Sequence, residues 1–308
     1  METGGQLAEH SFGGDWTEVK LAALQAYSVG FIQSIQQKFD LWYFDPFAGT
    51  GTRTVKTKVG AFFDLEPASV IEQEFPGSAA RALSLQPPFH HYRFGDIKPD
   101  HAASLRRLVE RYPDRDASVF EGDGNQFIQD EFRKPLWTRS GFSLGGPRAL
   151  VFLDPYGLAV QWETLRALAA CGKADVWFLA NLSGALRQLA HRYEKIDASK
   201  QASLAEVFGT ADWVSEFYKP PATDNLLGLI DGPAGRTASK TEVAAFHRQC
   251  LQGLFRYVSE PLPLRVGTMD DFFLLYCMSN SPSPPAIALI DRIATGVIRR
   301  YKLGISSL

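Results

Sequence analysis

One stretch of the chain, residues 41–52, constrains the fold more than any other. It runs from Leu41 through an apolar segment to Asp45, and then into a turn that contains Gly49 and Gly51. An apolar run that stops at an acid and a Gly-x-Gly turn is typical of a buried parallel strand followed by a ligand-binding loop. Glycines in such a turn allow positive φ angles and let the backbone approach a ligand closely. The stretch therefore predicts a site for a nucleotide-type cofactor, and the alternative is a tight loop after a core strand.

The spacing of the glycines indicates which cofactor to expect. A dinucleotide-binding loop needs a third glycine three residues after the second, and this chain has Thr54 there, which disfavours a nicotinamide oxidoreductase. The Asp-x-Phe-Ala-Gly-x-Gly pattern instead resembles motif I of class I methyltransferases, which bind S-adenosyl-L-methionine (SAM). The resemblance implies that Asp45, Phe47, Gly49 and Gly51 form part of the cofactor site.

Further apolar runs alternate with helical patterns along the chain. Strands are predicted at residues 91–96, within 118–125, and at 149–154 and 174–180, and an antiparallel strand pair is predicted at residues 263–266 and 272–279. Strands that alternate with helices at this spacing favour a doubly wound parallel sheet. We therefore expect an α/β protein with the Rossmann-like class I methyltransferase fold, whose mostly parallel sheet carries an antiparallel strand pair at its C-terminal end.

The length of 308 residues and the apolar content of 45% are sufficient for one large core. We expect a single domain over residues 1–308, with a helical lead-in at 1–40 and helical additions at 185–260. Residues 50–77 are expected to be irregular and to lie beside the cofactor pocket like a lid, which delays the next helix to Ser78. The alternative for this stretch is a solvated insertion.

Four predicted strands end on an acid, namely Asp45, Asp96, Asp123 and Asp154. Ligands of a doubly wound sheet bind at the carboxyl ends of its strands. In a SAM site, Asp45 would face the amino-acid moiety and Asp96 would accept from both ribose hydroxyls. Asp123 would accept from the adenine amino group, with Phe94 or Phe127 offering an apolar face to the ring. Any one of these acids could instead cap a helix.

The reaction centre is expected at Asp154, Pro155 and Tyr156, which are followed by Gly157. This tetrapeptide resembles the Asp-Pro-Pro-Tyr sequence of amino-group methyltransferases. There the acid and a backbone carbonyl accept hydrogen bonds from the target amine while an aromatic ring stacks on the base. Here a tyrosine replaces the second proline and a glycine replaces the aromatic residue, so the stacking role does not carry over directly. The alternative is a tight turn after a core strand.

Composition narrows the class of protein further. The net charge is −2, so contact with a nucleic acid would depend on a local basic patch. The three cysteines, Cys171, Cys250 and Cys277, lie far apart without metal-ligand spacing, which predicts neither a disulfide scaffold nor a metal site. The chain shows neither a signal-peptide pattern nor an apolar run of membrane-spanning length, so we expect a soluble cytoplasmic protein that is not bound to a membrane.

Several blocks together resemble one family, the three-Cys-motif partner proteins (TcmP-type). They include Asp15 to Leu21, Tyr43 to Gly51, Pro76 to Ser78, Leu150 to Gly157, Trp162 to Leu165, Phe208 to Thr210 and Phe273 to Asn280. The resemblance implies a methyltransferase-like fold and a protein partner, a radical-SAM-like protein with three cysteines. The favoured function is methyl transfer from SAM to a nucleic-acid or other amine acceptor. The alternative is a non-catalytic subunit that binds and regulates the three-Cys-motif partner.

Overall fold

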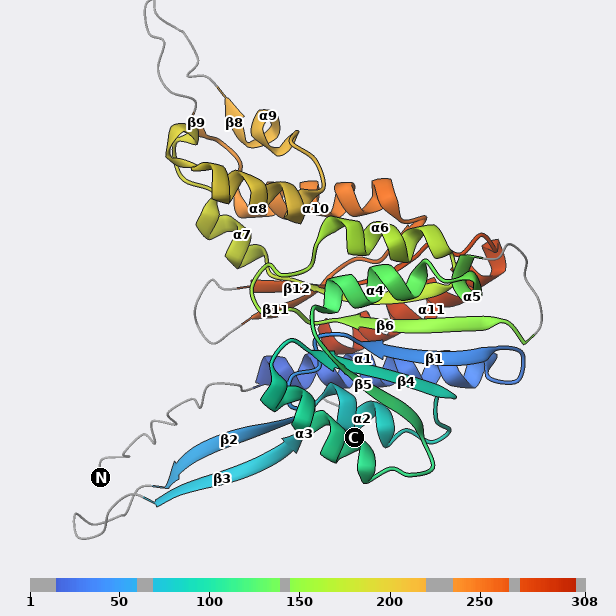
Figure 1. The fold of residues 1–308 in the computed structure, drawn as a ribbon. Helices are drawn as coiled ribbons and strands as arrows, with labels where there is room; N and C mark the ends of the chain where they lie inside the picture. Colours follow the sequence, from blue (N-terminus) through green and yellow to red (C-terminus); the bar gives the residue numbers. More distant parts are fainter. Residues whose placement is uncertain (1–14, 60–68, 139–144, 220–234, 266–271, 303–308) are drawn as a thin grey trace, which may run out of the picture.

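The structure is a computed structural model that describes residues 15–59, 69–138, 145–219, 235–265 and 272–302 (Figure 1). Eight strands in this part of the chain form one sheet. Its strands are β5 (Asp116–Glu121), β4 (His91–Asp96), β1 (Asp40–Asp45), β6 (Pro147–Leu153), β7 (Ala174–Ala180), β12 (Phe272–Ser279), β10 (Tyr257–Val258) and β11 (Leu262–Arg265). The order is β5-β4-β1-β6-β7-β12, and β10 and β11 both pair with the outer side of β12.

The direction of the strands confirms the predicted fold class. From β5 to β7 all neighbours are parallel, whereas β12 is antiparallel to β7. The chain starts at β1, builds outward through β4 to β5, and then crosses back to β6 on the other side of β1. The fold is thus Rossmann-like and of the class I methyltransferase type, with its topological switch point between β1 and β6.

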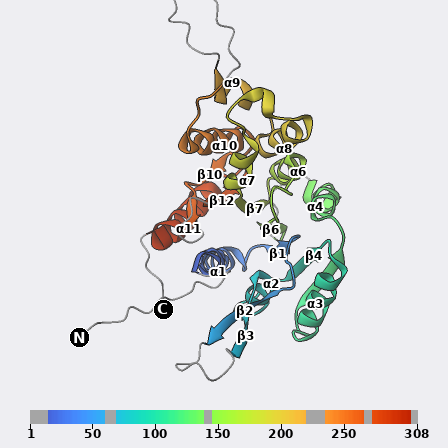
Figure 2. The ribbon, with the colours of Figure 1, turned by 90° about the vertical axis from the view of Figure 1, so that its left-hand side faces the viewer.

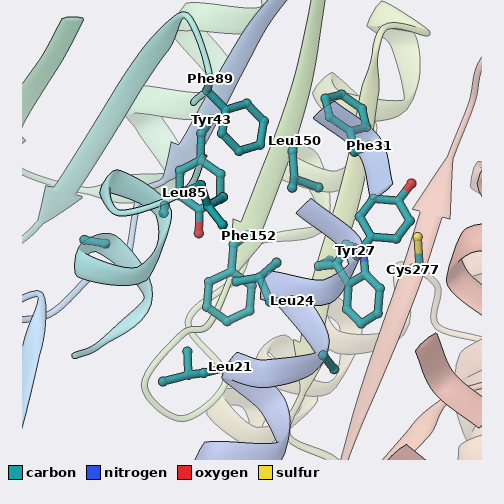
Figure 3. Close-up of a cluster of buried hydrophobic side chains, with 14 of the residues drawn as sticks. Leu21, Leu24, Tyr27, Phe31, Tyr43, Leu85, Phe89, Leu150, Phe152 and Cys277 are labelled. Atoms are coloured by element: carbon teal, nitrogen blue, oxygen red, sulfur yellow. The ribbon is translucent and has the colours of Figure 1, made fainter. Parts of the chain in front are cut away.

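One face of the sheet is covered by four helices, α1 (Asp15–Ile35), α2 (Ser78–Leu83), α3 (Pro99–Glu110) and α11 (Pro284–Lys302). Figure 3 shows Leu24 and Tyr27 of α1 in the same buried cluster as Tyr43 and Phe152 from the strands. The helices α1 and α11 cross closely, since a Cβ on Gly30 would lie 2.9 Å from Ile293. None of the described helices is long and apolar enough to span a membrane.

The opposite face is covered by α4 (Gly124–Phe132), α5 (Pro135–Thr138), α6 (Trp162–Cys171) and α10 (Lys240–Leu254), as the view in Figure 2 shows for α4 and α6. Central strand β6 is buried from Ala149 to Leu153 without interruption. A strand that is covered on both faces needs such a continuous apolar run. This explains the apolar run that predicts a strand at 149–154.

A helical region lies between β7 and β10 and has its own buried cluster. It contains α7 (Leu182–Gln188), a short 3₁₀ helix (Tyr193–Lys195), α8 (Ala198–Phe208), α9 (Trp213–Phe217), the two-residue strands β8 (Tyr218–Lys219) and β9 (Gly235–Arg236), and α10. Gly209 takes a positive φ of 68° and ends α8, so that α8 and α9 are separate helices. Gly209 also lies against the Trp162 ring, where a Cβ would come within 1.9 Å, and this contact joins the region to α6.

The stretch from 50 to 77 is not irregular as predicted. Its described part forms an antiparallel hairpin of β2 (Thr52–Val59) and β3 (Ser69–Pro76), which Figure 1 shows as an arm projecting from the body. At its base the Gly77 N–H donates to the Gly51 carbonyl at 3.0 Å. A Cβ on Gly77 would lie 2.7 Å from that carbonyl oxygen, so glycine is needed for this approach. The hairpin is therefore inserted into the turn after β1, and α2 starts at Ser78 as predicted.

Candidate functional site

The four predicted acids all lie at the carboxyl edge of the parallel strands. Asp45 and Asp96 are the last residues of β1 and β4, Asp154 directly follows β6, and Asp123 follows β5 by two residues. Asp45 and Asp154 flank the switch point between β1 and β6. This is the place where open α/β sheets bind ligands.

The glycine turn after β1 is held by the end of β4. The Ala48 N–H donates to the Gly95 carbonyl at 2.9 Å, and the Gly49 N–H donates to Asp96 Oδ2 at 3.1 Å. Gly49 and Gly51 have φ angles of 61° and 77°, as the sequence predicted. A Cβ on Gly49 would meet no atom within 4 Å, so this side of the turn faces open space that a ligand can occupy.

Asp96 is already engaged by the backbone on both oxygens. Besides the bond to Gly49, its Oδ1 accepts from the Lys98 N–H at 2.9 Å and lies 3.2 Å from His101 Nδ1. The carboxylate therefore organises the turn, and its contact with a ribose stays a prediction. The next residue, Ile97, is 68% exposed, which is unusual for a large aliphatic side chain. It presents an apolar surface beside Asp96 that the sequence reasoning missed.

Asp123 caps a helix, which was the alternative interpretation of this acid. Its Oδ1 accepts from the Asn125 N–H at 2.9 Å and caps α4. The predicted ring contact of Phe94 is wrong, because Phe94 is fully buried in the core on the α1 side of the sheet. Phe127 stacks on Phe120, with ring centres 3.8 Å apart. Contact of Asp123 with an adenine stays a prediction.

Phe47, also predicted to contact the cofactor, is partly buried beside the first turn of α4. Its ring lies so close to Gly124 that a Cβ there would come within 2.9 Å of Phe47 Cε1. The side chain thus packs the turn after β1 against α4. This packing role is visible in the structure, and a direct cofactor contact remains untested.

Asp45 is the most unusual of the four acids. It is fully buried, and neither carboxyl oxygen makes a hydrogen bond of ordinary geometry. Burial raises its pKa to about 7, although the nearby Ser78 hydroxyl and Lys20 act in the opposite direction. A buried carboxyl without a well-placed donor is destabilising, so its presence in a folded protein calls for an explanation. This side chain is therefore a candidate ligand for a cationic group.

The structure brings Lys20 of α1 to this edge, which the sequence reasoning did not foresee. Its Nζ forms a short ion pair with Asp154 Oδ2, and its side chain is only 5% exposed. The available signal was a lysine between the apolar residues Val19 and Leu21 of a helix. Helical spacing alone does not reveal which strand end such a lysine reaches.

The loop after β6 presents its aromatic side chain to solvent. Tyr156 is 98% exposed, and Gly157 turns the chain with a φ of 66°. The Gly157 carbonyl accepts a hydrogen bond from Asn181 Nδ2 at 3.3 Å, which fixes the loop to the end of β7. Asp154 and Pro155 thus lie at the switch point while Tyr156 projects outward, an arrangement suited to contact with a planar acceptor.

Comparison with known proteins yields similarity in structure only. No family model matches the chain, and no curated protein matches its sequence. Among solved structures it is similar to a Legionella pneumophila protein of family DUF519, with 13% identity, coverage of 93% of this chain and 94% of that chain, and a TM-score of 0.48. A putative methyltransferase from Escherichia coli shows 11% identity, coverage of 88% and 89%, and a TM-score of 0.36.

A putative methyltransferase from Thermobifida fusca is similar at 12% identity, with coverage of 86% of this chain and 82% of that chain and a TM-score of 0.37. At these identities and TM-scores the similarities assign neither a substrate nor an activity to this chain. The fold assignment depends on its own strand order, and any function must be argued from its own site.

Proposed function

We propose that this protein binds SAM at the carboxyl edge of the sheet and transfers its methyl group to an amine-bearing acceptor. The observation that carries this proposal is the fully buried Asp45, whose carboxyl oxygens accept no hydrogen bond of ordinary geometry, beside an open glycine turn. The α-amino group of the methionine moiety is a cationic donor that could satisfy this carboxyl. The residues present therefore fit the cofactor.

The neighbouring groups suit the other parts of SAM. Asp96 has lone pairs remaining on both oxygens for hydroxyl donors, since each carboxylate oxygen can accept more than one hydrogen bond. Ile97 offers an exposed apolar surface next to it, on which a purine ring can lie. When bound, SAM would supply an electrophilic methyl group on a sulfonium. The protein's own residues would supply all other interactions in the reaction.

The loop after β6 would position the acceptor. Asp154 forms an ion pair with Lys20 through Oδ2, and its carboxyl group can accept a hydrogen bond from an amine. The Pro155 carbonyl is a second acceptor in the same loop. Two such acceptors would orient the nitrogen lone pair and favour a planar amine, and the exposed Tyr156 ring can stack on its π system. A nucleic-acid base with an exocyclic amine has this chemistry.

Calorimetry on cofactor-stripped protein tests the first half of the proposal. SAM and S-adenosylhomocysteine should bind with micromolar affinity. As a control, Asp130→Ala on α4 should leave these affinities unchanged. It removes an exposed carboxylate that pairs with Arg133 away from the strand ends. Absence of binding heat with both ligands would refute cofactor binding.

Methyl transfer from labelled SAM to total cellular RNA, DNA and protein tests the second half. Asp154→Ala should leave SAM affinity nearly intact and remove most turnover, because the lost contact is made to the reacting amine. Its melting temperature must be compared with that of the wild type, since Asp154 also pairs with Lys20. Wild-type protein that binds SAM, transfers no label and binds a three-Cys-motif protein would instead favour a regulatory subunit.

A further inference from the structure

A buried cation of helix α1 is fixed at the candidate reaction centre by two contacts. Besides its ion pair with Asp154, the Lys20 ammonium lies 5.0 Å from the centre of the Trp16 ring. That ring in turn stacks on Phe273 of β12, with centres 5.1 Å apart and planes inclined by 3°. The first turn of α1 is therefore anchored to the sheet, and the ammonium is held in one place.

The groups that face this ammonium are mainly acidic. Asp154 reaches it from the loop after β6, and Asp45 at the end of β1 is close enough for Lys20 to lower its pKa. Tyr43 of β1 carries a buried hydroxyl whose pKa is raised by burial and by both acids. Lys20 thus supplies positive charge to two carboxyl groups that repel each other in a poorly solvated place.

We propose that Lys20 is a positioning residue, which binds Asp154 Oδ2 so that Oδ1 is directed to the acceptor amine. This inference deepens the proposed function and depends on it. Without Lys20, Asp154 would lose the contact that fixes its orientation and would be a less well-placed acceptor for an amine.

The test needs no knowledge of the acceptor. Sinefungin is a SAM analogue in which an amine-bearing carbon replaces the methylsulfonium, whereas S-adenosylhomocysteine has neither group. The ratio of their affinities therefore reports how well Asp154 receives a nitrogen at the place of the transferred methyl. Calorimetry of both ligands between pH 6.5 and 8.5 gives this ratio for each variant.

The wild type should prefer sinefungin and change that preference less than about twofold over this pH range. In Lys20→Met the preference should fall about tenfold, because Asp154 loses the contact that fixes its orientation. Lys20→Arg should restore most of the preference, since it keeps the charge and can donate to the same oxygen. A merely structural lysine would change the affinities for both ligands alike and leave their ratio unchanged.

Two further variants keep the result interpretable. Glu18→Gln removes another ion pair of the same helix turn, 2.6 Å from Arg81, without touching Asp154, and it should keep the wild-type ratio. If Lys20→Met folds poorly, Lys20→Met combined with Asp154→Asn removes both charges of the pair. This double variant should show a low preference that does not change with pH.

The outcomes separate the two proposals. A wild type that binds neither ligand refutes the proposed function, and the role of Lys20 with it. A wild type that prefers sinefungin, together with a folded Lys20→Met variant of unchanged preference at every pH, refutes the role of Lys20 only. An equal loss in Glu18→Gln also refutes it, because the effect would then come from displacement of α1.

Discussion

Asp45→Asn should make the cofactor-free protein more stable than the wild type, and this advantage should grow as the pH rises. Burial raises the pKa of this carboxyl from 3.8 to about 7 in the folded state, so the folded protein holds its proton more tightly than the unfolded chain does. The stabilisation of the folded state that comes from holding this proton is fully present below about pH 4, and it is lost as the pH rises through about 7. Asparagine does not titrate and removes this loss.

The magnitude follows from the shift. A difference of about 3 pKa units corresponds to about 4 kcal/mol at high pH, of which about 2.5 kcal/mol develops between pH 5 and pH 8. Urea unfolding at pH 5, 6, 7 and 8 measures the difference in unfolding free energy between Asp45→Asn and the wild type. That difference should grow by about this amount in favour of the variant.

A second buried acid provides the matched control. Burial raises the pKa of Asp175 to about 6, and its Oδ2 accepts from the Tyr27 hydroxyl at 2.7 Å. For Asp175→Asn, most of the gain in unfolding free energy over the wild type should therefore be reached by pH 6. For Asp45→Asn, this gain should increase by a further amount of about 1 kcal/mol between pH 6 and pH 7. A difference for Asp45→Asn that stays constant from pH 5 to 8 would refute the argument that burial without a donor destabilises its charged form.

Four other substitutions test the packing and the site. Gly95→Ala should lower the free energy of unfolding by about 1–3 kcal/mol in urea, because its Cβ would lie 2.0 Å from the Phe120 ring. Gly253→Ala in α10 should raise it by about 0.5–1 kcal/mol, because its Cβ would meet no atom within 4 Å. Ser239→Ala removes the cap of α10 and should lose about 1 kcal/mol in the same assay. Asp96→Ala should weaken SAM binding in calorimetry by about 1.5–3 kcal/mol and should also lower the melting temperature, since Asp96 accepts from two backbone N–H groups, and unchanged affinity would contradict its ribose role.

Local sequence pattern was sufficient for the parallel half of the fold. Residues 91–96 and 174–180 were predicted as strands with the bounds that β4 and β7 have. The reason is that an apolar run of strand length, ended by an acid or a turn, is a local signal that the buried sheet then satisfies. The positive φ angles of Gly49 and Gly51 were predictable for the same reason, because only the residues of the turn decide them.

Other features depended on packing between distant segments. The alternation along β4 places Tyr92 and Phe94 on one side, but the arrangement of the helices decides that this side is the buried face beneath α1. The hairpin at 52–76 was missed because charged and β-branched residues alternate there without the apolar face that identifies a core strand.

The sequence by itself determined that a cofactor-type turn would follow a central strand, and that acids would stand at one edge of a parallel sheet. Only the tertiary structure decided that Lys20 meets Asp154, from which it is separated by 134 positions, and that Asp45 is buried beside this pair. The physical reason is that helical and strand periodicities specify which face of an element is apolar. The partner of a single buried charge depends instead on how α1 packs across the ends of β1 and β6.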